Sequence, residues 1–196
     1  MADAKPVAIV LASTSPRRRS LLAAAGLQFE SLDPGPDGHS SASDPRQRVM
    51  DYAATKAASG HQLRPDAVVL ASDTLVWCEG EFLPKPLDQA DARRMLELMQ
   101  QCRHEVWTAV CVRNPMGEKF ADAAVARVEF GQIPHAELEQ YLNGQEWADK
   151  AGAYGIQGTA GKWAQLLDGD LDTVIGLPVS LSLRLLRQAG ACPSAI

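Results

Sequence analysis

The chain has 196 residues, of which 46% are hydrophobic and 22% charged, enough apolar sequence for one domain over residues 1–196, built as two lobes. Its net charge of −5 argues against a nucleic-acid partner, because basic residues would have to neutralise the nucleic-acid backbone. The longest uncharged run near the C-terminus covers residues 173–183, which is shorter than the roughly 18 residues that a membrane span needs. Residues 1–6 lack the apolar core of a signal peptide. We therefore expect a cytoplasmic protein without a membrane partner.

The first predicted strand covers residues 7–12, an apolar run without alternation, as expected of a strand covered on both faces. A helix is predicted over residues 17–25, with Ser15 as its N-cap and Pro16 at its first position. Arg17, Arg18 and Arg19 then lie beside the unpaired N–H groups of the helix start, which suits phosphate oxygens. Taken alone, the same cluster is also compatible with a solvated basic turn.

The next segments predict a short strand over residues 29–32, a turn over residues 33–38 and a helix that starts at Asp44-Pro45. Helical spacing places Lys56 on the same face as Val49 and Ala53, so this cation points along an apolar stripe. Such a lysine either snorkels to solvent or serves a functional site.

A carboxylate interrupts the next predicted strand. Residues 67–71 are apolar, Ser72-Asp73-Thr74 follows, and residues 75–77 resume the apolar run. A carboxylate in this position must be paired or face a cleft, so Asp73 is the strongest catalytic candidate, able to hold Mg²⁺ or to accept a proton from an attacking water. The alternative is an aspartate that bonds to nearby backbone at a strand bulge.

The rest of the chain alternates strands and helices. Lys85 is held between two prolines, and Asp88 is predicted to cap a helix. Residues 106–112 and 123–130 are predicted as paired strands. Two more helices are predicted over residues 134–142 and 178–188. The pattern predicts an α/β fold with a mixed sheet flanked by helices. The four cysteines lack CxxC spacing and are expected to be reduced packing residues.

Residues 149–158 contain three glycines, and glycines of this density allow backbone to approach a ligand closely. Gln157 adds an amide that can donate and accept, which suits the edge of a nucleobase, although a flexible loop is the plain alternative. The run Gly158–Lys162 is not a Walker loop, because its glycine spacing is wrong and Trp163 replaces the metal-binding hydroxyl. His104, just before a predicted strand, could cap the strand or orient a neighbour.

The order of these segments resembles the Maf-type nucleoside triphosphate pyrophosphatases from about residue 7 to residue 187. The motifs that carry the likeness are Ser13-x-Ser15-Pro16-Arg17-Arg18, Lys56-Ala57, Ser72-Asp73-Thr74, Lys85-Pro86, His104-x-Val106-x-Thr108, residues 149–158 and Gly176-Leu177-Pro178.

The resemblance implies an elongated, twisted sheet of the inosine-triphosphatase type, with two lobes around a central cleft, in a homodimer. It also implies hydrolysis of a nucleoside triphosphate between the α and β phosphates, with Mg²⁺ or Mn²⁺ as the cofactor. Asp73 matches the family's proton acceptor and a metal ligand, and Lys56 and Lys85 match its catalytic lysines. The positions that match substrate-binding residues are Ser13, Ser15, Arg17, Arg18, Thr74 and Gln157.

The Asp73-Thr74 pair and the run over residues 153–158 resemble the dTTP/UTP branch of the family. Both cleaning of nucleotide pools and control of cell division stay open as the biological role. Relatives commonly carry an acidic pair where this chain has Asp37-Gly38, so Asp37 is the remaining candidate for a second metal carboxylate. The alternatives are a pyrophosphatase for 7-methyl-GTP or a noncanonical purine triphosphate, and a non-hydrolysing nucleotide-binding regulator of cell division.

Overall fold

The computed structural model describes residues 7–36 and 38–191, which form two compact units. Unit 1 takes its described residues from 7–73, 108–124 and 176–191, and unit 2 consists of residues 74–107 and 125–175. Seven strands form one sheet in the order β2-β1-β3-β5-β6-β7, with β4 paired to β3. Because β1 pairs in parallel with β2 and β3, whereas β3–β4 and β6–β7 are antiparallel, the predicted α/β fold with a mixed sheet is confirmed.

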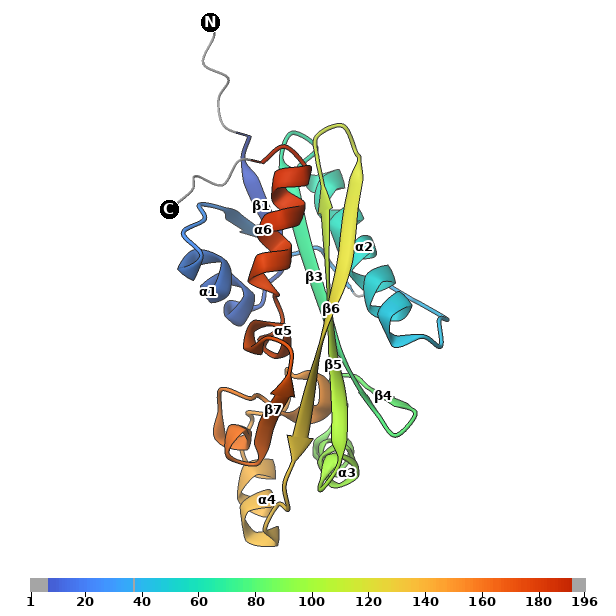
Figure 1. The fold of residues 1–196 in the computed structure, drawn as a ribbon, viewed down its shortest axis with the longest axis vertical. Helices are drawn as coiled ribbons and strands as arrows, with labels where there is room; N and C mark the ends of the chain where they lie inside the picture. Colours follow the sequence, from blue (N-terminus) through green and yellow to red (C-terminus); the bar gives the residue numbers. More distant parts are fainter. Residues whose placement is uncertain (1–6, 37, 192–196) are drawn as a thin grey trace, which may run out of the picture. The chain divides into compact units, whose positions relative to one another are not determined.

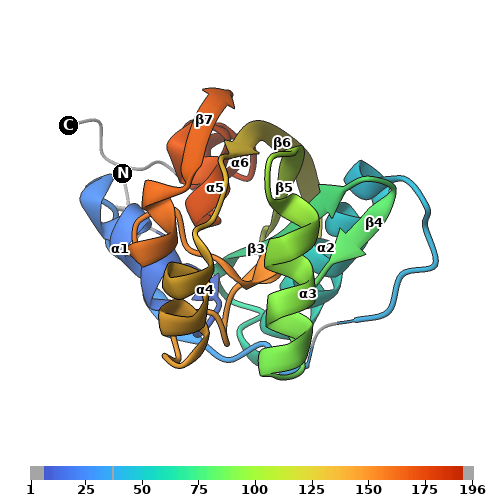
Figure 2. The ribbon, with the colours of Figure 1, turned by 90° about the horizontal axis from the view of Figure 1, so that it is seen from below.

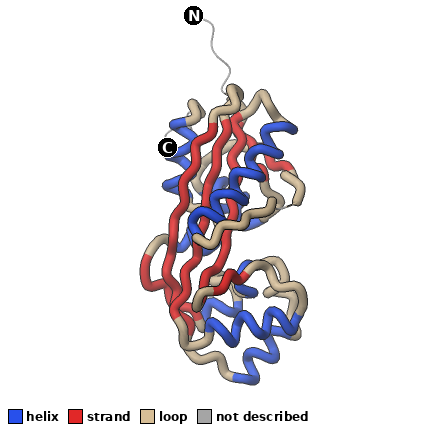
Figure 3. The backbone as a smooth tube through the Cα atoms, turned by 90° about the vertical axis from the view of Figure 1, so that its right-hand side faces the viewer, coloured by secondary structure: helices blue, strands red, loops and turns tan. Residues whose placement is uncertain are grey.

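Unit 1 has helices on both faces of its strands (Figures 1 and 3). Strand alternation explains this layering, because successive side chains point to opposite faces. Leu11 and Leu70 belong to a hydrophobic core that includes residues of α1 and α6, whereas Val69 faces α2, whose Gly60 lies against it. The elements are β1 (Ile9–Ala12), α1 (Pro16–Ala24), β2 (Glu30–Leu32), α2 (Pro45–Leu63), the first part of β3 (Val68–Cys78), the last part of β5 (Arg103–Arg113), the first part of β6 (Lys119–Phe130) and α6 (Val179–Gln188).

The helix starts follow the capping signals of the sequence. Ser15 accepts a hydrogen bond from the backbone N–H of Arg18, Asp44 caps α2, and Asp88 caps α3 (Gln89–Met99). Each side-chain oxygen satisfies one of the backbone N–H groups that a helix start leaves without an intrahelical partner. These predicted starts are confirmed.

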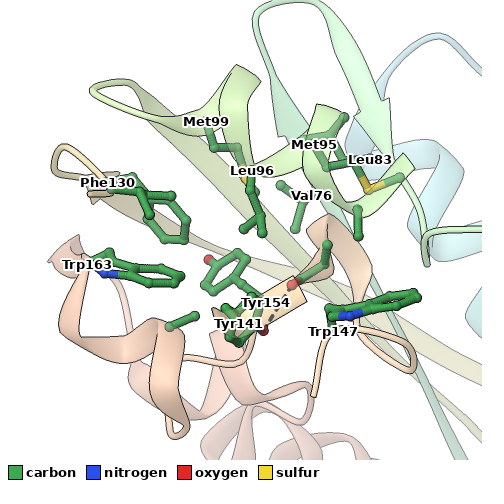
Figure 4. Close-up of a cluster of buried hydrophobic side chains, with 14 of the residues drawn as sticks. Val76, Leu83, Met95, Leu96, Met99, Phe130, Tyr141, Trp147, Tyr154 and Trp163 are labelled. Carbon is green, nitrogen blue, oxygen red and sulfur yellow. Dashed lines mark hydrogen bonds between the residues drawn. The ribbon is translucent and has the colours of Figure 1, made fainter. Parts of the chain in front are cut away.

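Unit 2 contains an aromatic core. The rings of Phe130 and Tyr154 lie 4.8 Å apart between centroids, and those of Tyr141 and Trp163 lie 5.4 Å apart (Figure 4). Helices α3 and α4 lie side by side and add aliphatic side chains to this core (Figure 2). Besides α3, the unit comprises the second part of β3, β4 (Glu81–Leu83), parts of β5 (Arg103–Arg113) and β6 (Lys119–Phe130), α4 (His135–Leu142), the 3-10 turns η1 (Ala151–Ala153) and η2 (Thr159–Lys162), β7 (Ala164–Asp168) and α5 (Leu171–Ile175).

The structure differs from the sequence predictions at several places, including β4, which is not predicted, and β6, which begins at Lys119 and not at residue 123. Residues 149–158, for which a flexible loop is the alternative, include η1, and η2, β7 and α5 follow where no element is predicted. His104 lies inside β5 and not before it. Strand β5 begins three residues before the predicted strand, because residues 103–105 belong to it although they are not apolar.

Cys78, Cys102 and Cys111 are free thiols, as predicted, whereas Cys192 and Asp37 fall outside the described residues. Burial raises the pKa of the Cys78 and Cys111 thiols to about 11. Among the helices that the structure describes, none has the length and apolar character to cross a membrane.

Candidate active site

Asp73 lies in the middle of β3 and faces α2. Alternation from Val69 places Asp73 on the α2 face of the strand, where its Oδ1 accepts a hydrogen bond from the Lys56 ammonium. Both residues are buried, each with 8% of its surface exposed. The expected alternative for Asp73, a carboxylate bonded to nearby backbone at a bulge, is therefore not what the structure contains.

The Lys56–Asp73 ion pair is costly for the fold. Removing two charges from water costs several kcal/mol per ion, and their mutual attraction recovers this only when the geometry is good. If one partner is removed, about 3–5 kcal/mol is lost because the other charge stays buried without compensation. Buried charges of this kind are candidates for function, since a substrate can exchange contacts with them.

The neighbouring residue, Ser72, points to the opposite face of β3 and donates a hydrogen bond to the Gly176 carbonyl over 2.9 Å. The Arg18 Nε donates to the same carbonyl, also over 2.9 Å. Gly176 has a φ of 122°, a conformation that strongly favours glycine. Arg18 and Ser72 thus fix the start of α1 and the middle of β3 to the segment that precedes α6.

The loop after β1 begins beside the middle of β3. Leu11 pairs in parallel register with Leu70, so Ser13 and Ser72 each follow two residues later. Ser13 is buried, and its hydroxyl accepts a hydrogen bond from the Ser15 N–H over 3.2 Å. The hydroxyls of Ser13 and Ser15 therefore shape the loop and the helix start from which the half-buried Arg17 projects.

The predicted site residues fall into both units. Ser13, Ser15, Arg17, Arg18, Lys56 and Asp73 belong to unit 1, whereas Thr74, Lys85 and Gln157 belong to unit 2. Lys85 and Gln157 are exposed, and Thr74 is half-buried. The Pro84 carbonyl accepts a hydrogen bond from the Gly152 N–H over 3.1 Å, which ties the loop that carries Lys85 to η1. Asp37 cannot be placed because it lies outside the described residues.

A buried polar pair that the sequence only hints at lies in unit 2. His104 Nε2 and the Tyr154 hydroxyl are 2.8 Å apart. Burial lowers the pKa of His104 to about 4, so the imidazole is neutral at pH 7, and burial also raises the pKa of Tyr154. The prediction that His104 orients a neighbour is consistent with this contact, and the neighbour lies three residues before Gln157.

Comparisons with known proteins match nearly the whole chain. The family model described as "Maf-like protein" matches residues 8–189. A protein of Koribacter versatilis named "dTTP/UTP pyrophosphatase" is 38% identical over 93% of this chain and 94% of its own length. Proteins with the same name from Anaeromyxobacter dehalogenans and Deinococcus radiodurans are 42% and 39% identical, each over 93% of this chain and over 94% and 93% of their own lengths.

A crystal structure of a nucleoside-triphosphatase, also named dITP/XTP pyrophosphatase, from Mycobacterium abscessus aligns with a TM-score of 0.48 and 16% identity. The alignment covers 95% of this chain and 98% of that chain.

Proposed function

Since the chain belongs to the family of Maf-like proteins, we propose that it hydrolyses dTTP and UTP to the nucleoside monophosphate and pyrophosphate. The observation that carries the proposal is the buried Lys56–Asp73 pair, which lies in the middle of β3, level with the point where the arginine-bearing loop leaves β1. A carboxylate and cations are the groups that phosphoryl transfer requires, because its transition state spreads negative charge over the phosphate oxygens.

In the proposed mechanism Asp73 accepts a proton from the water that attacks the α-phosphorus. Lys56 pairs with this carboxylate in the free enzyme and adds positive charge when the triphosphate binds. Arg17 and Arg18 bind phosphate oxygens at the start of α1, where N–H groups of the first turn also favour an anion. Lys85, which matches a catalytic lysine of the family, is proposed as a further cation.

Gln157 is proposed to read the base, because its amide can donate and accept at the edge of a pyrimidine. Thr74 follows Asp73 directly, so it is proposed to contact the substrate beside the reacting phosphates.

A divalent metal fits these residues only together with the substrate. The described residues contain no group of three or more histidine, cysteine or acidic side chains able to hold a metal. Mg²⁺ is often bound by one or two carboxylates together with substrate phosphates, so Asp73, with Asp37 as the second candidate, suits a Mg²⁺ or Mn²⁺ ion that arrives with the triphosphate. When bound, the metal would neutralise charge on the phosphate oxygens. A homodimer and a cytoplasmic location also stay proposals.

The test is pyrophosphate release from dTTP, UTP, CTP, 7-methyl-GTP and ITP, with and without Mg²⁺ or Mn²⁺. We expect the highest kcat/KM for dTTP and UTP, and loss of activity without metal. Asp73→Asn should lower kcat by about 10²–10⁴-fold, the range of general acid–base catalysis. Asp66→Asn is the matched control, because Asp66 is exposed and pairs with Arg64 in the same unit.

Three results would contradict the proposal. Preference for 7-methyl-GTP or ITP would assign another substrate class. Binding of dTTP without pyrophosphate release would indicate a nucleotide-binding regulator. Parental activity of Asp73→Asn would remove Asp73 from the reaction.

A further inference from the structure

Gln157 occupies the corner of a tight turn. The Gly158 N–H donates to the Gly155 carbonyl over 3.0 Å, which closes a β-turn over Gly155-Ile156-Gln157-Gly158. Ile156 is half-buried and packs against the core of unit 2, whereas Gln157 is exposed. The turn therefore has one anchored side chain and one that is presented to solvent.

The Glu146 carboxylate holds the end of this turn. The Thr159 N–H donates to Glu146 Oε1 over 2.9 Å and to Oε2 over 3.3 Å. A Cβ added to Gly158 would lie 1.8 Å from Oε1. The carboxylate thus occupies the space of a side chain at position 158, which explains why glycine is required there.

Lys150 holds the beginning of the same turn. A Cβ added to Gly155 would lie 2.7 Å from the Lys150 Cε, so the lysine stem lies against this glycine. The Lys150 ammonium donates to the backbone carbonyl of Glu146 and, over 2.7 Å, to Asp149. Glu146 and Lys150 are therefore linked to each other and contact opposite ends of one turn.

A third contact restricts the turn from the side of η2. The Gly161 N–H donates to the Gly158 carbonyl over 3.0 Å, and a Cβ at Gly161 would lie 2.2 Å from the Ile156 carbonyl oxygen. Every glycine from 155 to 161 is thus closely approached by another group. The glycines of this segment serve close packing and do not make it a flexible loop.

We propose that Glu146 is a positioning residue that fixes the Gly155–Gly158 turn and thereby sets the base preference through Gln157. The inference rests on the proposed function, because it requires Gln157 to contact the base. A fixed turn has already lost its conformational freedom, so the substrate does not have to order it on binding. Without Glu146 the Gln157 side-chain amide would sample other orientations. The affinity for the preferred base would then fall toward the affinity for other bases.

Three variants test the role of Glu146. Glu146→Ala removes the acceptor, Glu146→Gln keeps one side-chain oxygen for the Thr159 N–H, and Glu97→Ala is the control, because Glu97 is an exposed residue of unit 2 whose Arg93 contact is 3.8 Å long. We expect Glu146→Ala to raise KM for dTTP and UTP about 10-fold, as the loss of one hydrogen bond to a charged group predicts, with kcat nearly unchanged. The preference for dTTP over CTP should fall, and Glu146→Gln should recover most of both effects.

Hydrogen exchange at the Thr159 amide, measured without nucleotide, gives a readout that is independent of activity. Exchange should become faster in Glu146→Ala and stay at the parental rate in Glu97→Ala. Parental exchange in Glu146→Ala would overturn the proposed contact, and faster exchange with parental KM and base preference would overturn the proposed link to Gln157. If the parental protein releases no pyrophosphate from any nucleotide, the proposed function and the link to base preference both fail, while the exchange rates still decide whether Glu146 holds the turn.

Discussion

Replacing both members of the buried His104–Tyr154 pair with phenylalanine should reduce the loss of folding stability in acid. Burial lowers the pKa of His104 from its ordinary 6.5 to about 4, so this side chain stays neutral in the folded protein over a range in which the unfolded chain binds a proton. The unfolded state therefore gains stability as the pH falls from about 6.5 to about 4. Above about pH 6.5 the neutral, buried His104 contributes fully to the free energy of unfolding. This contribution is lost as the pH falls from about 6.5 to about 4.

The size of the effect follows from the shift. Between pH 7 and pH 4.5, one group with these two pKa values lowers the free energy of unfolding by about 2.5 kcal/mol. The double variant His104→Phe/Tyr154→Phe lacks this titration. Its stability at pH 7 should stay close to the parental value, because two bonded polar groups are replaced together by apolar groups of similar shape.

The assay is urea unfolding followed by tryptophan fluorescence at several pH values from 7 to 4.5, with linear extrapolation to water. Trp147 and Trp163 lie in the core of unit 2 and report on it directly. His135→Gln is the control, since it removes a histidine of the same unit whose side chain is 85% exposed. A double variant that loses as much stability in acid as the parent would show that His104 is not kept neutral by burial.

Three further changes test other parts of the molecule. Lys56→Ala should lower the free energy of unfolding by about 3–5 kcal/mol in a urea titration, because Asp73 stays buried and unpaired, and a parental midpoint would contradict this. Gly60→Ala should cost about 1–3 kcal/mol in the same assay, since the new Cβ would lie 2.9 Å from the Val69 Cγ1. Burial raises the pKa of Cys111 to about 11, so this thiol should resist a disulfide reagent at pH 8 until urea is added, as mass spectrometry of the labelled peptide can check.

The sequence predicts most elements correctly where short-range signals decide. Ser15-Pro16 and Asp44-Pro45 place two helix starts within one residue, because a cap bonds to backbone only three residues away. Asp73 is recognisable as a special residue because its apolar neighbours make an isolated carboxylate expensive. The contact with Lys56 also requires that α2 covers the face of β3 from which Asp73 projects. The sequence of α2 alone and the sequence of β3 alone do not predict this packing.

The predictions fail or stay incomplete where distant segments decide. Strand β7 is five residues long and pairs with β6, with a register shift between Arg127 and Val128. It forms because β6 offers it backbone partners, and the sequence of residues 164–168 alone does not predict this pairing. The contact between Glu146 and the turn at Gly158 joins residues on two sides of η1. The density of glycines is the one local signal for it, and that signal is also typical of a flexible loop.

The division of unit 1 among three chain segments has a consequence for biosynthesis. Its core receives Leu185 and Leu186 from α6, near the end of the described chain, whereas unit 2 is complete once residue 175 has been added. Domains generally fold as units while the ribosome elongates the chain. Unit 2 can therefore mature before unit 1, whose core is complete only after α6 has been synthesised.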